Sequence, residues 1–291
     1  MKKLYVVCPA LLFVSASVCA QSDSASLRAD TTPIIQPAIV KETPKEIYKL
    51  NYGVDIPVTA TGTIWSLYAF TKIYNKDASS DEAVLALDRN NVNGFDRWAI
   101  RPYSKRIDQI SYIPFYASMP MPLFMMIDNR MRKDIAKLSF MYLEAMSVTG
   151  LLYTGSTYFF DRYRPYVYSS ETDLDQRTRG GGKNSFYAGH VALVATSTFF
   201  LAQVYSDYHP ESKTKWVFWS VATAATGATA WWRHRGGLHF PSDILLGIAQ
   251  GTATGILVPR LHRSKWFKNR NLTILPYTGQ SHGLAMIYKF N

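Results

Sequence analysis

Arg233, His239 and Asp243 follow one another at the spacing R-x5-H-x3-D, which suits nucleophilic chemistry by a histidine. Pro241 favours the first turn of a helix, so Asp243 is expected inside that turn and His239 just before it. Residues four apart at a helix start share a face, which brings the Asp243 carboxylate within reach of the His239 ring. A carboxylate on one ring nitrogen leaves the other with a free lone pair. An ordinary helix cap with a salt bridge is the alternative interpretation.

A second cationic group lies upstream, where Arg164 precedes Pro165 at the end of an apolar segment, 138–160. The proline stops the helix and places Arg164 at its mouth. A guanidinium offers a planar fork of donors that matches phosphate oxygens. Arg162, two residues earlier, is interpreted as a solvated or structural charge.

A third group, Gly189-His190, opens the apolar segment 187–205. Glycine allows the backbone to approach an anion closely, and the backbone amides of Ala188 and Gly189 lie where a helix start favours phosphate. His190 is then positioned to give a proton to a leaving group.

Six apolar segments must position these residues, and each is long enough for a helix. They are 58–74, 110–127, 138–160, 187–205, 216–232 and 243–258. No run of alternating residues rivals them. The sequence therefore predicts an all-α bundle of about six core helices.

Whether the bundle is membrane-embedded depends on its two most apolar segments. Segment 138–160 has Glu144 as its one charge, and segment 243–258 has Asp243 alone, so both are able to span a bilayer. We expect a membrane-embedded bundle, although a mean hydropathy of −0.09 suits a soluble bundle as well. Basic loops on one side of alternating segments place the motif residues on the periplasmic side.

The N-terminal region has the features of a secretory signal peptide, residues 1–20. Lys2 and Lys3 precede an apolar run and a small-residue exit that ends at Ala20. Both cysteines lie inside it, which excludes disulfides and thiolate chemistry from the mature chain. Residues 21–50 are polar with scattered prolines and read as a linker.

The remaining parts carry no predicted chemistry. Residues 75–109 form a mixed-charge loop with too few acids for a calcium site. The tail, 263–291, is basic and contains a short β-hairpin pattern. The net charge is +11, which becomes +9 without the signal peptide, and it favours anionic membrane surfaces or phosphorylated molecules. No nucleic-acid-binding module is visible.

In their order and intervals, Arg164-Pro165, Gly189-His190 and Arg233-x5-His239-x3-Asp243 resemble the three motifs of the phosphatidic acid phosphatase type 2 superfamily. That superfamily includes membrane lipid phosphatases, class A acid phosphatases and vanadium haloperoxidases. The resemblance implies a helical phosphatase domain over residues 51–262.

The resemblance also implies a role for each motif residue. His239 would form a phosphohistidine with Asp243 orienting it, and His190 would be the general acid. Arg164, Arg233 and the Gly189 amide would hold the phosphoryl oxygens. The arginines make a metal or another cofactor unnecessary.

Three positions depart from the family pattern. Thr157 stands where the family has a lysine, Ala188 where it has a serine, and Trp232 where it has another serine. Lys183, Arg177 or Arg179 from the glycine-rich loop is a candidate to replace the missing cation.

The sequence and the resemblance together predict a metal-independent envelope phosphatase that acts on phosphate monoesters of lipids. Lipid A, phosphatidate and phosphatidylglycerophosphate are the candidate substrates, and the inner membrane with a periplasmic active site is the expected location. A soluble periplasmic acid phosphatase and a non-catalytic protein that binds anionic headgroups are the alternatives. A haloperoxidase is disfavoured because a vanadate cage needs more cations.

Overall fold

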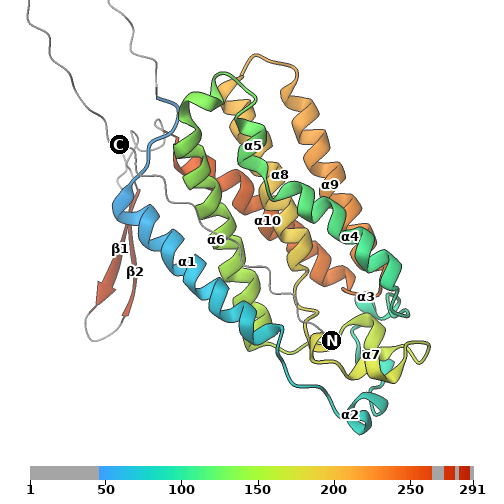
Figure 1. Ribbon diagram of the computed structural model, residues 1–291. Helices are drawn as coiled ribbons and strands as arrows, with labels where there is room; N and C mark the ends of the chain where they lie inside the picture. The colour runs from blue at the N-terminus through green and yellow to red at the C-terminus, as the bar shows by residue number, and fades with distance from the viewer. Residues whose placement is uncertain (1–45, 264–271, 279–281, 289–291) are drawn as a thin grey trace, which may run out of the picture. The chain divides into compact units, whose positions relative to one another are not determined.

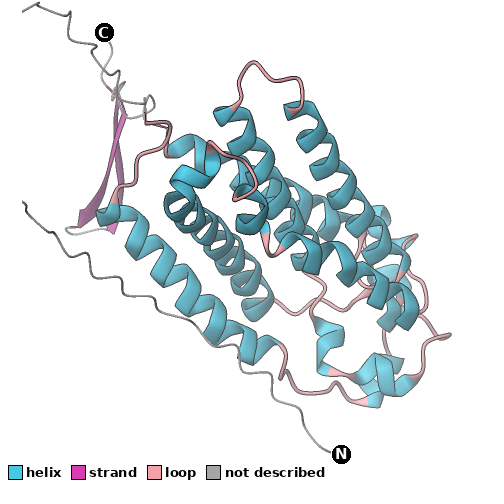
Figure 2. Cartoon of the chain, turned by 45° about the horizontal axis from the view of Figure 1, so that its top comes forward, coloured by secondary structure: helices cyan, strands magenta, loops and turns pink. Residues whose placement is uncertain are grey.

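The computed structural model describes residues 46–263, 272–278 and 282–288, and helices dominate this part of the chain (Figures 1 and 2). Its α-helices are α1 (Tyr52–Ile73), α2 (Asp81–Leu85), α3 (Gly94–Arg97), α4 (Lys105–Ser118), α5 (Met121–Met125), α6 (Ile135–Phe159), α7 (Leu174–Thr178), α8 (Gly189–Tyr208), α9 (Lys215–Arg235) and α10 (Pro241–Leu261). Short 3-10 turns are η1 (Arg89–Asn91), η2 (Met131–Asp134), η3 (Pro165–Tyr168) and η4 (Gly180–Lys183).

The long helices of the described residues confirm the predicted bundle. Five of the six predicted apolar segments fall within α1, α6, α8, α9 and α10, each extended or trimmed by a few residues. Segment 110–127 differs, because it forms the end of α4 and then the separate short helix α5. The break falls at Pro120, which has no N–H group to continue the helical hydrogen bonds.

Helix α8 lies at the centre of the bundle and contacts α4, α5, α6, α9 and α10 (Figure 1). Most of its residues are buried, on all sides of the helix. A helix buried on every side has no polar face, which is why its sequence shows apolar residues without a clear stripe. Its first turn carries the Gly189-His190 motif into the interior of the site.

Close packing of α10 against α8 depends on three glycines at four-residue spacing. A Cβ atom at Gly251 would lie 2.2 Å from the backbone oxygen of Ala192, and one at Gly247 would lie 2.8 Å from that of Ala188. Gly255 approaches Thr196 in the same way, at 2.6 Å. Small residues at this spacing let two helix backbones approach closely, as they do between membrane helices.

Polar residues lie inside the bundle while large apolar residues face outward. The Thr149 and Thr196 hydroxyls are 2.7 Å apart in the interior. By contrast, Ile64 is 69% exposed, Trp216 66% and Leu245 55%. Two described helical stretches, Met131–Phe159 and Pro241–Leu261, are long and apolar enough to cross a membrane, a property that buried helices of soluble proteins share.

Chain direction gathers the motif residues at one end of the bundle. Helices α6 and α9 end there, while α8 and α10 begin there. The short helices α2, α3 and α7 cover the same end, since α3 contacts α10 and α7 contacts both α2 and η3 (Figure 1). The connecting loops, not the long helices, therefore supply most of the site.

The two ends of the sequence contribute less. The predicted signal peptide and residues 21–45 of the predicted linker lie outside the described residues. The linker's last residues pack, because Tyr48 is buried and the Lys49 amide donates to the His262 carbonyl at 2.8 Å. In the tail, β1 (Leu272–Thr278) pairs antiparallel with β2 (His282–Tyr288), with Leu272 opposite Tyr288.

Candidate active site

Backbone hydrogen bonds join the first motif loop to the second. The Ser185 amide donates to the Arg162 carbonyl at 3.0 Å, and the Arg164 amide donates to the Gly182 carbonyl at 2.8 Å. This strand-like pairing fixes where Arg164 leaves the loop. Main-chain hydrogen bonds therefore bring the two motifs together although they are separated in the sequence.

The third motif is joined to the other two in the same way. The Tyr166 amide donates to the Gly237 carbonyl at 3.0 Å, and the Ala188 amide donates to the Asp243 carbonyl at 3.2 Å. The second bond corrects one expectation, because the Ala188 amide already has an acceptor and is not a free phosphate donor. The amide of Gly189, the first residue of α8, remains at the helix start, where N–H groups have no acceptor within the helix.

His239 is buried with one ring nitrogen fixed by the backbone. Its Nδ1 lies 2.7 Å from the Ser185 carbonyl oxygen, and its exposed fraction is 1%. A carbonyl only accepts, so Nδ1 carries the proton and Nε2 keeps its lone pair. This is the tautomer that a nucleophilic histidine requires.

Asp243 supports His239 indirectly, which differs from the contact expected from their spacing. Its Oδ2 accepts from the Ser185 hydroxyl at 2.6 Å and from the Phe240 amide at 3.1 Å. Ser185 thus donates a hydrogen bond to Asp243 from its hydroxyl and accepts one from His239 at its carbonyl. The helix start was predicted correctly, since Pro241 is the first residue of α10 and Asp243 lies in its first turn.

A network of ion pairs holds Asp243 in place. Arg162 donates to Asp243 from Nη1 and to Asp96 from Nη2, the latter at 2.7 Å. Asp96 also accepts from the amide and the hydroxyl of Ser242, at 3.0 and 2.5 Å. Burial alone would raise the pKa of Asp96, but these hydrogen bonds from Ser242 and Arg162, with one from Asn93, lower it. Arg162 is therefore a structural charge, as the sequence suggested.

Arg233 is buried at 1% exposure and only partly paired. Its Nη1 donates to Asp108 at 2.8 Å and to Ser111 at 3.0 Å. Its Nε is buried without a hydrogen-bond partner among the described residues. A buried N–H group without an acceptor is costly, and a phosphoryl oxygen would satisfy it.

Arg164 presents the second guanidinium. It immediately precedes η3, and its Nε donates to the Asn184 carbonyl at 3.3 Å. That bond orients the guanidinium plane, and within the described part of the chain no hydrogen bond involves the two terminal nitrogens. Paired guanidinium groups of this kind stabilise the charge on a phosphoryl group during transfer.

His190 lies against two aromatic rings at the start of α8. Its ring centroid is 4.7 Å from that of Tyr112 and 4.8 Å from that of Phe115. Burial, followed by the charges of Arg233 and Arg164, lowers its pKa well below the usual value. A bound phosphate dianion offsets both charges and favours the protonated form that a general acid needs.

His239 lies within electrostatic range of the other three motif side chains. Burial lowers its pKa well below the usual value, and the charges of Arg164, Arg233 and His190 lower it further. Two imidazoles therefore share one cationic environment with two guanidiniums. Such a site suits a bound anion and a neutral, nucleophilic His239.

Comparison with known sequences finds one family model that matches part of the chain. Residues 138–267 match the sequence profile of the PAP2 superfamily. A lipid A 4'-phosphatase of Porphyromonas gingivalis is 28% identical over 113 residues, which cover 37% of this chain and 44% of that protein. A transmembrane PAP2-type phosphatidylglycerolphosphate phosphatase from Bacillus subtilis, at 18% identity, superposes with a TM-score of 0.40 over 76% of this chain and 98% of its own.

Thr157, which stands where the PAP2 pattern has a lysine, and two of the candidate replacement cations each have partners within the protein. Thr157 is fully buried, and its hydroxyl donates to the carbonyls of Tyr153 and Phe186, both at 3.0 Å. Lys183, the candidate replacement cation, lies 4.0 Å from Asp161 at its nearest carboxylate oxygen. Arg177 is held by the backbone of the loop, with Nε donating to the Val167 carbonyl at 2.8 Å.

Several supporting residues of the PAP2 site had no clear signal in the sequence. Asp108 and Ser111, which hold Arg233, lie outside the matched segment, as does Asp96. The one available sign was the three-residue spacing of Asp108 and Ser111 near the start of a helix, which puts these two side chains on one face. Ser185, which joins His239 to Asp243, is an ordinary loop serine in the sequence.

Proposed function

We propose that this protein hydrolyses phosphate monoesters of a phosphorylated lipid through a phosphohistidine on His239. The observation that carries the proposal is the state of that side chain. It is buried, its Nδ1 proton is held by the Ser185 carbonyl, and its free Nε2 shares a cationic environment with Arg164 and Arg233. A neutral imidazole beside two guanidiniums is suited to attack a phosphorus atom whose oxygens those guanidiniums bind.

The proposed reaction has two steps. His239 Nε2 forms a bond to phosphorus while the ester P–O bond breaks, and His190 gives its proton to the departing alkoxide oxygen. A water molecule then attacks the phosphohistidine, His190 takes a proton from that water, and the N–P bond breaks to release phosphate. Asp243 acts through Ser185 as a positioning residue.

Lipid A is the first substrate to test, because the matched relative is named a lipid A 4'-phosphatase. Phosphatidate and phosphatidylglycerophosphate are the other candidates. The outward Ile, Leu and Trp side chains and the glycine-mediated helix packing support a membrane location. Basic residues beside the opposite helix ends, including Arg130, Arg132 and Arg260, favour an inner-membrane orientation with the active site in the periplasm.

The decisive experiment measures phosphate release from these three lipids by the purified wild type and by His239→Ala. We expect the wild type to release phosphate, with inhibition by vanadate, and the variant to lose at least about 10³-fold in kcat/KM. His209→Ala is the matched control, because His209 also pairs with an aspartate, Asp128, at 2.9 Å but lies outside the site. Turnover that survives in His239→Ala would exclude the mechanism.

Two further measurements separate the alternatives. Acid quenching of the wild type should trap phosphate on His239, whereas lipid binding without trapping or turnover would indicate a non-catalytic headgroup-binding protein. Membrane fractionation should require detergent to release the protein, whereas release by salt alone would favour a soluble periplasmic phosphatase.

A further inference from the structure

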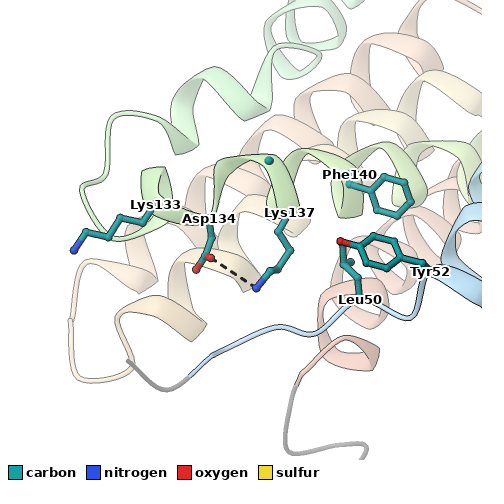
Figure 3. A pocket seen from close by; sticks show the side chains of 7 residues that line it. Leu50, Tyr52, Lys133, Asp134, Lys137 and Phe140 are labelled. Atoms are coloured by element: carbon teal, nitrogen blue, oxygen red, sulfur yellow. Dashed lines mark ion pairs between the residues drawn. The ribbon is translucent and has the colours of Figure 1, made fainter. Parts of the chain in front are cut away.

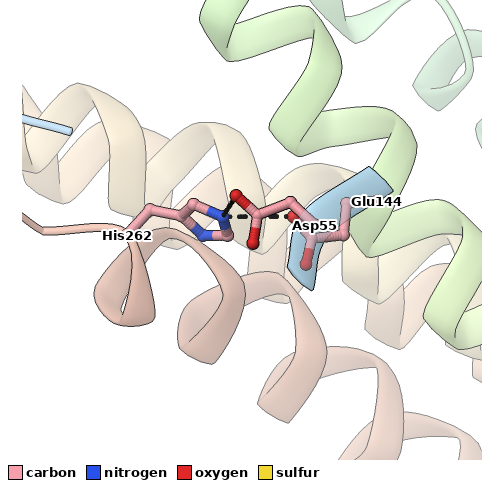
Figure 4. A group of neighbouring side chains, drawn as sticks. All are labelled: Asp55, Glu144 and His262. Carbon is pink, nitrogen blue, oxygen red and sulfur yellow. Dashed lines mark ion pairs between the residues drawn. The ribbon is translucent and has the colours of Figure 1, made fainter. Parts of the chain in front are cut away.

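Three buried ionisable side chains converge where α10 ends, away from the motif residues where it begins. Asp55 comes from α1, Glu144 from α6 and His262 directly follows α10 (Figure 4). Their exposed fractions are 5%, 7% and 4%. Since α10 has 21 residues, this cluster lies about 30 Å along the helix from His239.

The facing atoms of the cluster lie within ion-pair distance of one another. His262 Nε2 lies 3.2 Å from Asp55 Oδ2 and 3.2 Å from Glu144 Oε2. Both Glu144 Oε2 and His262 Nε2 are nevertheless buried without a hydrogen-bond partner among the described residues. Two unsatisfied polar atoms that point at a common position indicate a missing partner there.

The spacing of these atoms fits a metal ion. Carboxylate oxygen and imidazole nitrogen bind Zn²⁺ at about 2.0–2.1 Å, so tetrahedral ligands lie about 3.3 Å apart. The two measured separations from His262 are close to that value, and all three ligand atoms lie within 4.8 Å of one another. A cation between the three side chains would satisfy both orphaned atoms at once.

The hydrogen bonding of His262 prepares it to be a ligand. Its Nδ1 lies 2.8 Å from the Val258 carbonyl, which can only accept, so Nδ1 holds the proton. Nε2, the atom that would coordinate a metal ion in place of a proton, faces the two carboxylates. Metal-binding histidines are commonly oriented by such a bond from their other ring nitrogen.

The charge of the cluster also favours a divalent cation. Among the described residues, no lysine or arginine forms an ion pair with Asp55 or Glu144. Two buried carboxylates are costly unless a positive charge compensates them. A divalent ion with neutral His262 gives a net charge of zero, whereas a protonated His262 alone leaves one negative charge uncompensated.

We propose that Asp55, Glu144 and His262 bind a divalent transition-metal ion that fastens α1 to α6 and to the end of α10. One imidazole and two carboxylates suit Zn²⁺ or Mn²⁺ better than Mg²⁺ or Ca²⁺, which prefer oxygen ligands throughout. The ion is structural and distinct from the phosphoryl site, which the arginines serve.

A surface pocket lies beside α1 and α6, the two helices that supply the carboxylates. It is lined by Leu50, Tyr52, Lys133, Asp134, Ala136, Lys137 and Phe140 (Figure 3). Phe140 lies one turn of α6 before Glu144, and Tyr52 lies one turn of α1 before Asp55. The pocket therefore opens beside the same pair of helices that supplies both carboxylates.

The test uses the full chain, purified in detergent, dialysed against a chelator and titrated with Zn²⁺ and Mn²⁺. We expect one tightly bound equivalent of one of these ions and a rise in Tm of about 5 °C on binding. Glu144→Gln keeps the size of the side chain and removes its charge, so it should weaken binding about 100-fold. Asp128→Asn is the matched control, because it changes an aspartate that pairs with a single histidine, His209.

Two results would overturn the proposal. One is a wild type that binds neither ion above background, which would identify the cluster as a metal-free triad with a protonated His262. The other is Glu144→Gln binding as tightly as the wild type. If Glu144→Gln does not fold, Co²⁺ bound to the wild type should show the visible absorption of nitrogen and oxygen ligation, and absence of that spectrum counts against the site. These readouts do not depend on phosphatase activity.

Discussion

The two ends of α10 each present a buried histidine, and the two differ in the sign of the neighbouring charges. His239 donates from Nδ1 to the Ser185 carbonyl, and His262 donates from Nδ1 to the Val258 carbonyl. Both rings therefore direct Nε2 into the interior. Guanidiniums act on His239, whereas carboxylates face His262. The same side chain in the same tautomer thus suits attack on an anion at one end and binding of a cation at the other.

Burial makes this difference effective. Both histidines are almost fully buried, so water does not screen the charges beside them. A buried histidine by itself therefore says little about function. The charged side chains beside it determine whether the site suits an anion or a cation. Changes that remove or move groups at either end of α10 test this comparison.

Loss of a cation at the phosphoryl end should have the largest effect. Arg233→Ala removes a buried guanidinium whose Nε has no acceptor among the described residues, and we expect kcat/KM for phosphate release to fall about 10³-fold. Steady-state kinetics on the purified variant measure this loss. The equivalent change at the other end, Glu144→Gln, should alter kcat/KM less than fivefold when its folded fraction is assayed. Equal losses in the two variants would contradict the division of roles.

The second largest loss of activity is expected from disturbing the close packing at the start of α8. A Cβ atom at Gly189 would lie 2.5 Å from the Tyr153 ring, so Gly189→Ala must displace the helix start that carries His190. A displacement of this size costs about 100-fold in rate. Gly181→Ala is the control, because nothing lies within 4 Å of the added atom. Retained activity in Gly189→Ala would show that the approach is not needed.

Removal of the Ser185 hydroxyl should have a modest effect. In Ser185→Ala the backbone carbonyl still holds His239, while Asp243 loses one hydrogen bond worth about 1–1.5 kcal/mol. We therefore expect kcat to fall about tenfold with KM nearly unchanged. A loss as large as that of His239→Ala would mean that the hydroxyl, not the carbonyl, controls the histidine.

The smallest effect concerns pH. Burial and then the arginine charges lower the pKa of His239, so its neutral form persists below pH 6.5 and the acid limb of kcat/KM should lie below that value. Arg164→Ala removes one of those charges and should move this limb upward by less than one pH unit. Neutral His239 also makes the folded state lose stability as pH falls below about 6.5, because the unfolded chain binds the proton more readily. A limb that moved downward would contradict the assigned charge.

Much of the fold followed from local patterns. Long apolar segments predicted most of the long helices, and Pro241 predicted where α10 begins. The pattern did not predict the division of segment 110–127, since Pro114 is tolerated within α4 while the helix stops at Pro120. Pro114 lies well inside α4, so a proline within a helix does not always end it, and sequence alone does not show which of two nearby prolines will.

The sequence by itself determined which chemical groups the phosphoryl site has, because the arginines, histidines and aspartate stand in recognisable short motifs. Tertiary structure alone decided how they are connected: Asp243 reaches Ser185 instead of His239, Asp96 joins from a distant loop, and Asp55, Glu144 and His262 meet from three helices. The reason is physical. Spacing along one helix or turn fixes local neighbours, whereas contacts between buried charges depend on how separate helices pack and on which partner each charge finds when water is excluded.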